Sequence, residues 1–88
     1  MGWVKGVRLW LRSGGKASGV VFIVRRKLGT AVMRNRLKRR LRSICRELEF
    51  RQGSVVIAAQ PAAIEASYWE LREELNELIS RYVKGLSR

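Results

Sequence analysis

The basic residues of this chain are concentrated in one half of it, and this limits how the chain can fold. Residues 1–46 carry 14 lysines and arginines and no acid, whereas residues 47–88 carry five basic residues and seven glutamates. The cations of the first half have no counter-charge and repel one another, which costs stability in a lone protein. A soluble surface normally mixes both signs. The segregation therefore indicates a polyanionic partner, with nucleic acid the first candidate and an anionic membrane the second.

The composition excludes several classes of site. The 88 residues predict one domain, spanning residues 1–88, and they include no histidine and no aspartate. Histidine metal sites, Ser–His catalysis and aspartate-centred metal clusters are therefore excluded. The single cysteine, Cys45, excludes an internal disulfide and is typical of a reducing cytoplasm. The longest apolar runs have about five residues, against the roughly 20 of a membrane helix, and the N-terminus has no apolar stretch of signal-peptide length. We expect a cytoplasmic protein.

Three segments have strand patterns. Residues 7–12 alternate strictly, which predicts a half-buried strand with Val7, Leu9 and Leu11 inward. The same alternation turns Arg8, Trp10 and Arg12 outward. Residues 13–19 predict a turn or short loop. The apolar, β-branched runs at residues 20–24 and 54–59 predict strands that are covered on both faces.

Two segments have helix patterns. Thr30 is a candidate N-cap for a helix of about residues 30–49, which residues 51–53 end. Its core positions follow helical spacing: Leu37, Leu41, Ile44, Cys45 and Leu48. Pro61 opens a short helical turn through residue 66. Ser67 and Glu70 match a capping box for a second helix of about residues 68–84, with Gly85 as its stop.

The order strand, strand, helix, strand, helix predicts an α+β fold, a small sandwich of helices on a sheet. The first helix is long enough to connect two parallel strands. The general rule for such a crossover makes it right-handed.

The first helix carries the strongest candidate binding surface. Cations fill the circumference that its apolar stripe leaves free, at Arg34, Arg36, Lys38, Arg39, Arg40, Arg42 and Arg46. Like charges at this spacing destabilise a lone helix, whereas a phosphate backbone would reverse the sign. Asn35 lies among them, and its amide could read a base edge or a ribose hydroxyl, or simply be solvated.

The strand at residues 7–12 is the second candidate surface. An outward Trp10 between Arg8 and Arg12 would form a stacking platform for single-stranded nucleic acid. The alternative is that Trp10 packs under the C-terminal helix while the arginines extend to solvent. We expect Trp3, Trp69 and Cys45 to be packing residues.

The glutamates are the only candidate catalytic acids. Five of them lie around the C-terminal helix, where exposed charge is expected: Glu65, Glu70, Glu73, Glu74 and Glu77. We therefore expect no hydrolysis of RNA by the chain alone.

Residues 27–42, Lys-Leu-Gly-Thr-Ala-Val-Met-Arg-Asn-Arg-Leu-Lys-Arg-Arg-Leu-Arg, strongly resemble the signature of the protein subunit of bacterial ribonuclease P. That family has a Lys-x-Gly-x-Ala-Val-x-Arg-Asn-Arg-x-Lys-Arg pattern. The strand at residues 55–58, Pro61-Ala62 and Ser67-Tyr68 are also similar to the family. The resemblance covers about residues 7–83.

The resemblance implies a sandwich like domain 2 of ribosomal protein S5, with a left-handed crossover through the basic helix. It also implies a function: to help a catalytic RNA remove the 5′ leader of precursor tRNA, an endonucleolytic step. The RNA and its magnesium would do the chemistry, so the chain alone would bind no cofactor and supply no catalytic residue. No membrane and no obligate protein partner are expected.

The resemblance also implies which residues bind. The catalytic RNA would contact Lys27, Arg34, Asn35, Arg36, Lys38, Arg39, Arg40 and Arg42. The 5′ leader would lie on the exposed sheet face, against Arg8, Trp10, Arg12 and Arg25.

The sequence departs from the family pattern in places. The family's N-terminal helix, whose aromatics help line the leader cleft, is absent from this sequence. Arg25-Arg26 stand where the family commonly has Ser-Lys, Thr30 where it often has Lys, and Ala59-Gln60 where basic residues are common. A stand-alone basic RNA-binding module, of ribosomal or chaperone type, is therefore the alternative. Buried strands disfavour a membrane-surface protein, because an interfacial helix needs no sheet.

Overall fold

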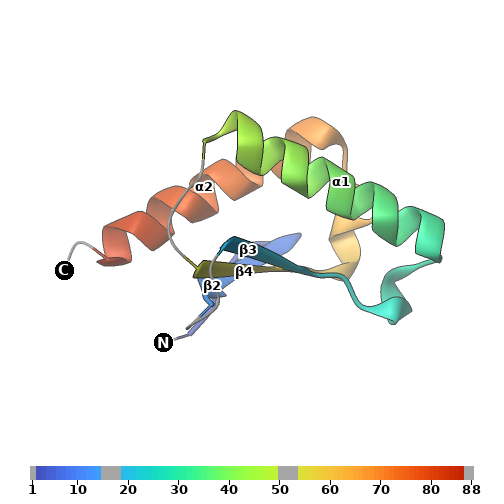
Figure 1. The fold of residues 1–88 in the computed structure, drawn as a ribbon, viewed down its shortest axis with the longest axis horizontal. Helices are drawn as coiled ribbons and strands as arrows, with labels where there is room; N and C mark the ends of the chain where they lie inside the picture. The colour runs from blue at the N-terminus through green and yellow to red at the C-terminus, as the bar shows by residue number, and fades with distance from the viewer. Residues whose placement is uncertain (1, 15–18, 50–53, 87–88) are drawn as a thin grey trace.

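The computed structural model describes residues 2–14, 19–49 and 54–86, so the turns predicted within residues 15–18 and at 51–53 lie outside the described residues. The chain forms an α+β fold, as predicted (Figure 1). Its elements, in chain order, are β1 (Val4–Lys5), β2 (Leu9–Ser13), β3 (Gly19–Ile23), the 3-10 turn η1 (Arg26–Leu28), α1 (Ala31–Glu47), β4 (Ser54–Ala59), the 3-10 turn η2 (Pro61–Ala63) and α2 (Tyr68–Leu86).

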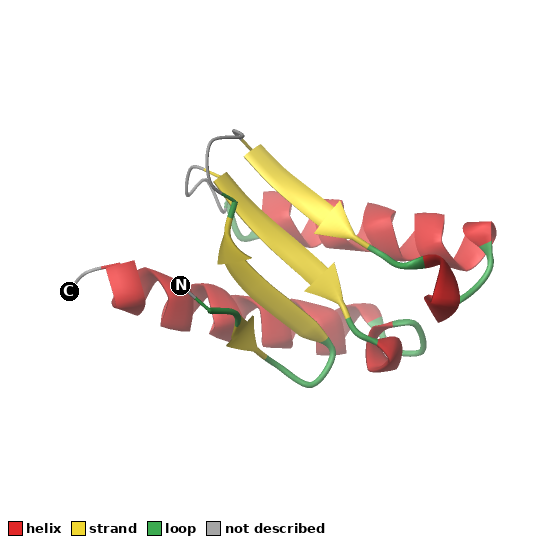
Figure 2. Ribbon diagram, turned by 90° about the horizontal axis from the view of Figure 1, so that it is seen from below, coloured by secondary structure: helices red, strands yellow, loops and turns green. Residues whose placement is uncertain are grey.

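The strands form one sheet in the order β1-β2-β4-β3. β2 pairs antiparallel with β1 and with β4, whereas β3 and β4 pair in parallel. Both helices lie on the same face of this sheet (Figure 1). The opposite face is not covered by any helix of the described part of the chain (Figure 2).

The connection from β3 through α1 to β4 is left-handed. In Figure 2 the helices lie behind the sheet, and β3 and β4 point the same way. For an observer who follows β3 from its start to its arrowhead, β4 lies on the right-hand side. This arrangement agrees with the implication of the family resemblance and departs from the general right-handed rule.

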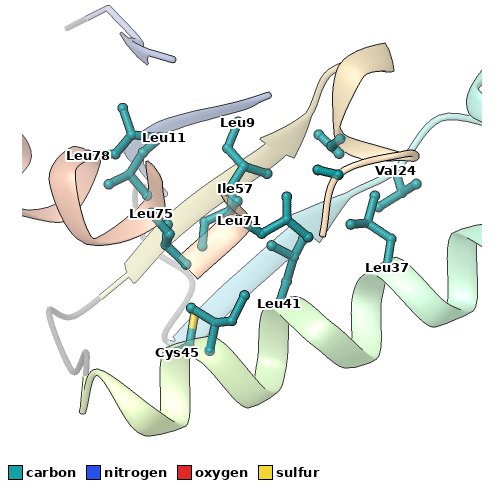
Figure 3. Packing of buried hydrophobic residues seen from close by; sticks show 14 of the residues in the cluster. Leu9, Leu11, Val24, Leu37, Leu41, Cys45, Ile57, Leu71, Leu75 and Leu78 are labelled. Carbon is teal, nitrogen blue, oxygen red and sulfur yellow. The ribbon is translucent and has the colours of Figure 1, made fainter. Parts of the chain in front are cut away.

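The core lies between the sheet and the two helices (Figure 3). Four elements contribute the fully buried side chains: Leu9 and Leu11 from β2, Val55 and Ile57 from β4, Leu41 and Ile44 from α1, and Leu71, Leu75 and Leu78 from α2. Cys45 is buried with them, as expected, and burial raises the pKa of its thiol to about 11. A protonated, enclosed thiol is a packing group.

Both predicted helix caps are present. The Thr30 hydroxyl accepts a hydrogen bond from the Met33 amide at 3.2 Å and begins α1. At α2, the Glu70 amide donates to Ser67 Oγ at 3.2 Å and the Ser67 amide donates to Glu70 Oε1 at 2.8 Å. This reciprocal pair is the capping box that the sequence predicted.

Some predictions about the elements were wrong. Val7 is 75% exposed, because β2 begins only at Leu9 and Val7 lies in the preceding turn, closed by the Gly6 amide and the Leu9 carbonyl at 2.8 Å. β3 is an edge strand with one uncovered face, so Val21 and Ile23 are 44% and 38% exposed. α2 also continues through Gly85 to Leu86.

Candidate nucleic-acid interface

The cations of α1 are divided among different sides of the helix. One row, which we call the outer stripe, consists of Asn35, Arg39, Arg42 and Arg46. These residues follow the spacing i, i+4, i+7, i+11, which places them on the side opposite the buried Leu37, Leu41 and Ile44. All four are exposed and point away from the sheet. This row matches the predicted RNA-binding surface most closely.

Two predicted RNA-binding arginines also make contacts within the protein. The Arg40 guanidinium donates to the Ala66 carbonyl at 3.3 Å, in the segment that precedes α2. Arg34 Nε donates to the Gly29 carbonyl at 3.3 Å, across the turn that precedes α1. Both side chains are half-buried, as is Lys38, whereas Arg36 is exposed. Arg34 and Arg40 therefore hold local structure as well as carrying charge.

Within the described residues, no cation of α1 forms an ion pair. The carboxylates that pair do so elsewhere: Glu47 with Arg72, Glu70 and Glu74 with Arg8, and Glu77 with Arg81. Glu47 also accepts a hydrogen bond from the Tyr68 hydroxyl, and this contact, followed by those with Arg72, lowers its pKa. The outer stripe therefore has a positive charge that no side chain of the described chain neutralises.

Lys27 and Arg25 lie together at the end of the parallel strand pair. They line a cavity of about 230 Å³ with Leu28 from η1 and with Ala59, Gln60 and Pro61 at the end of β4. The family resemblance implies that Lys27 contacts the catalytic RNA and that Arg25 contacts the leader. Both residues lie at one junction between the sheet and the start of α1.

The open face of the sheet carries two tryptophans. Trp10 alternates with the buried Leu9 and Leu11, so it points away from the helices, and this excludes packing under α2. Its ring lies 6.0 Å from that of Trp3, and Lys5 Nζ lies 4.7 Å from its ring centroid. Arg12 in turn lies over the Trp3 ring at 4.6 Å. Aromatic rings flanked by cations can stack bases and hold phosphates.

Arg8 does not belong to this face, contrary to the prediction. Because the strand begins at Leu9, alternation does not reach Arg8, and the turn directs its side chain to α2. There its guanidinium pairs with Glu70 at 2.9 Å and with Glu74 at 3.2 Å. Trp3 takes its place on the face, although the sequence indicated packing. The two-residue β1 is too short to show a period that could have located Trp3.

Trp69 is exposed rather than packed, with 66% of its surface accessible, although the sequence indicated packing.

No group of His, Cys, Asp or Glu side chains in the described part of the chain could hold a metal ion. No helix among residues 2–14, 19–49 and 54–86 is long and apolar enough to cross a membrane.

Comparison with known proteins agrees with this arrangement. A family described as Ribonuclease P matches residues 5–83. The protein named Ribonuclease P protein component of Symbiobacterium thermophilum is 42% identical over 78 residues, covering 85% of this chain and 68% of that protein. The protein of the same name in Thermus scotoductus is 44% identical over 66 residues, covering 75% of this chain and 40% of that protein. The chain thus spans well under half the length of the Thermus scotoductus relative.

Solved structures share the fold. The ribonuclease P protein of Thermotoga maritima superposes with a TM-score of 0.75 at 24% identity, covering 91% of this chain and 82% of that one. A Staphylococcus aureus ribonuclease P protein, a mutant with defective mRNA degradation activity, gives a TM-score of 0.77 at 20% identity, covering 90% and 72%. At these identities the likeness shows the fold.

Proposed function

The chain belongs to the ribonuclease P protein family, and on that basis we propose that it acts as the protein subunit of a ribonucleoprotein that removes the 5′ leader of precursor tRNA. Its partner is the catalytic RNA of that enzyme. The observation that carries the proposal is the outer stripe of α1, whose cations no carboxylate of the described chain neutralises. An RNA backbone laid along α1 supplies the missing negative charge and releases counterions.

The open sheet face is the proposed site of the single-stranded leader. Trp3 and Trp10 provide stacking surfaces, and Lys5 and Arg12 lie within reach of the phosphates between stacked bases. The cavity lined by Arg25 and Lys27 lies where the strands end, between this face and α1. A substrate strand that leaves the sheet face at that end would meet the RNA bound to α1.

The catalytic chemistry is assigned to the RNA and the magnesium that it binds. The carboxylates of the described chain are either paired, as Glu70 and Glu74 are with Arg8, or dispersed on the surface. Purified protein with magnesium and without RNA should leave precursor tRNA intact. Specific 5′ cleavage by the protein alone, abolished by one glutamate substitution, would contradict this assignment.

The test of RNA binding uses two double variants that each remove two cations. Arg39→Gln with Arg42→Gln changes the outer stripe, whereas Arg81→Gln with Lys84→Gln changes exposed cations of α2. Dissociation constants for a transcribed ribonuclease P RNA, for example that of Symbiobacterium thermophilum, are measured over a series of salt concentrations. Each lost phosphate contact should reduce the log–log salt slope by about 0.7–0.9.

In the outer-stripe variant, the magnitude of the log–log salt slope should therefore fall by about 1.5. The variant should also bind the RNA more weakly at low salt. The α2 variant should keep the slope of the unaltered protein. Thermal unfolding of both variants serves as the control for folding. Equal losses in the two variants, or an affinity indifferent to salt, would argue against α1 as the RNA-binding element.

A further inference from the structure

Trp69 is a large aromatic side chain that the core does not use. It lies in the first turn of α2 with 66% of its surface exposed. The neighbouring Tyr68 meets its ring edge-on, with the ring centroids 6.0 Å apart. Arg72, one turn further along α2, lies with its guanidinium 5.7 Å from the ring centroid. Most of the indole is therefore open to a ligand.

The groups around Trp69 are fixed by contacts between the two helices. The Tyr68 hydroxyl bonds to Glu47 and lies 3.2 Å from Ser43 Oγ, both on α1. Glu47 Oε2 also accepts a hydrogen bond from Arg72 Nε at 3.2 Å. The side chains on both sides of Trp69 are thus anchored to α1. Because its surroundings are ordered before any ligand arrives, stacking on this ring costs little further ordering.

The surface beside Trp69 is the cationic side of α1. Ser43, which meets Tyr68, lies between Arg39 and Arg46 of the outer stripe at the spacing i−4 and i+3. The guanidinium of Arg40 reaches the Ala66 carbonyl, just before α2 begins. The positive surface of α1 therefore continues across the contact between the helices to the start of α2.

The acids of α2 lie mainly on another side of the helix. Glu70, Glu74 and Glu77 follow the spacing i, i+4, i+7, and the first two pair with Arg8 of the β1–β2 turn. Glu47 is neutralised by Arg72. Glu73, one turn beyond Trp69, is exposed and lines a hollow with the three acids of that row and Arg8. An anionic ligand on α1 can therefore reach Trp69 without crossing a row of carboxylates.

We propose that Trp69 stacks on an exposed base of the same RNA that binds the outer stripe of α1. The RNA-binding surface then includes both helices, with phosphates held by α1 and one base, unpaired or at the end of a duplex, held by α2. This inference rests on the proposed function, because it names an additional contact of the same RNA.

The first experiment measures binding of Trp69→Ala in the full chain to the ribonuclease P RNA used above, over the same salt series. Loss of one stacked base should weaken binding about 5- to 100-fold. The salt slope should not change, because stacking neutralises no phosphate. Trp69→Phe should recover most of the affinity. Val7→Ala, which removes an exposed apolar side chain from the β1–β2 turn, should bind like the unaltered protein.

The second experiment follows the indole directly. The chain has three tryptophans, so Trp3→Phe with Trp10→Phe leaves Trp69 as the only one. Its fluorescence should be quenched as RNA is added, with the concentration dependence of binding. Thermal unfolding of Trp69→Ala should match that of the unaltered protein, because the side chain makes no core contact.

The possible outcomes distinguish a failure of the Trp69 stacking inference from a failure of the proposed function. If Trp69→Ala binds RNA normally and the Trp69 emission does not respond, the inference is wrong and the proposed function stands. If the unaltered chain binds no ribonuclease P RNA, the proposed function is wrong and the inference falls with it. If Trp69→Ala converts a dimer to a monomer without affecting RNA affinity, Trp69 is a contact between protein copies and the inference is overturned.

Discussion

At the scale of single residues, Glu74 is the clearest departure from what its residue type suggests. Its side chain is only 10% exposed, and its Oε2 accepts the amides of Arg8 and Leu9 at 2.7 and 2.6 Å. A Cβ added to Gly6 would lie 2.5 Å from the same oxygen. Glu74 therefore fixes the turn that leads into β2. Helical spacing alone does not distinguish Glu74 from exposed glutamates, because the distinction depends on a turn 66 residues away in sequence.

Glu74→Ala should destabilise the protein by about 1–3 kcal/mol, because it leaves two inward backbone amides without an acceptor. Glu77→Ala is the matched control, since Glu77 makes only a long exposed ion pair with Arg81 at 4.0 Å. Such a pair contributes about 0.3–0.5 kcal/mol. Urea unfolding at neutral pH measures both free energies. Equal effects of the two substitutions would show that the carboxylate does not hold the turn.

At the scale of elements, the features that depend on neighbouring residues could be predicted from the sequence. The features that depend on contacts between distant elements could not. The N-cap of α1, the bounds of β4 and the capping box of α2 each depend on neighbouring residues, and all three agree with the structure. The open face of β3 depends on its position at the sheet edge, which no pattern within residues 20–24 encodes. The pairing of Arg8 depends on α2 in the same way.

The capping box of α2 should give the stability of the protein a measurable pH dependence. The hydrogen bonds from Ser67, then the charge of Arg8, lower the pKa of Glu70 below its ordinary value of 4.5. A carboxylate with a lowered pKa stabilises the folded state above pH 4.5, and this contribution is lost as the pH falls through the folded pKa. Glu70→Gln should therefore lower the Tm at pH 7, and the difference should shrink as the pH falls below 4.5.

Glu73→Gln provides the comparison for this pH series. Glu73 is exposed and makes no hydrogen bond or ion pair within residues 2–14, 19–49 and 54–86. Its substitution should leave the Tm difference near zero at each pH. A Tm difference for Glu70→Gln that stays constant from pH 7 to pH 3 would mean that the ionised carboxylate does not cap the helix.

At the scale of the whole molecule, the fold separates two candidate RNA surfaces by its core. Both helices lie on one face of the sheet (Figure 1), and the outer stripe of α1 lies opposite the residues that this helix buries. Trp10 alternates with the buried Leu9 and Leu11, so it lies with Trp3 on the sheet face that no helix of the described chain covers (Figure 2). The sequence predicted both surfaces, because helical and strand periods each show which side chains point outward. It could not predict that Arg8 leaves the sheet face or that Trp69 joins the surface at the helices. These two placements are decided by packing between elements.

Separation by the core predicts that the two surfaces act independently in the assembled enzyme. Trp10→Ala should weaken binding of leader-bearing precursor tRNA about 5- to 100-fold, the range expected for one stacked base, and should leave binding of mature tRNA unchanged. Arg39→Gln with Arg42→Gln should weaken assembly with the catalytic RNA and leave the preference for a leader intact. Substitutions at separate sites add within about 0.3–0.5 kcal/mol, a factor of about two.

The triple variant should therefore show both losses, each within about twofold of its value alone. The measurement is a cycle of four proteins, with dissociation constants for the catalytic RNA and then, at saturating protein, for tRNA with and without a leader. A coupling of tenfold or more would mean that one RNA strand contacts both surfaces. The junction lined by Arg25 and Lys27 would then be the route between them, because it is where the open sheet face meets the start of α1.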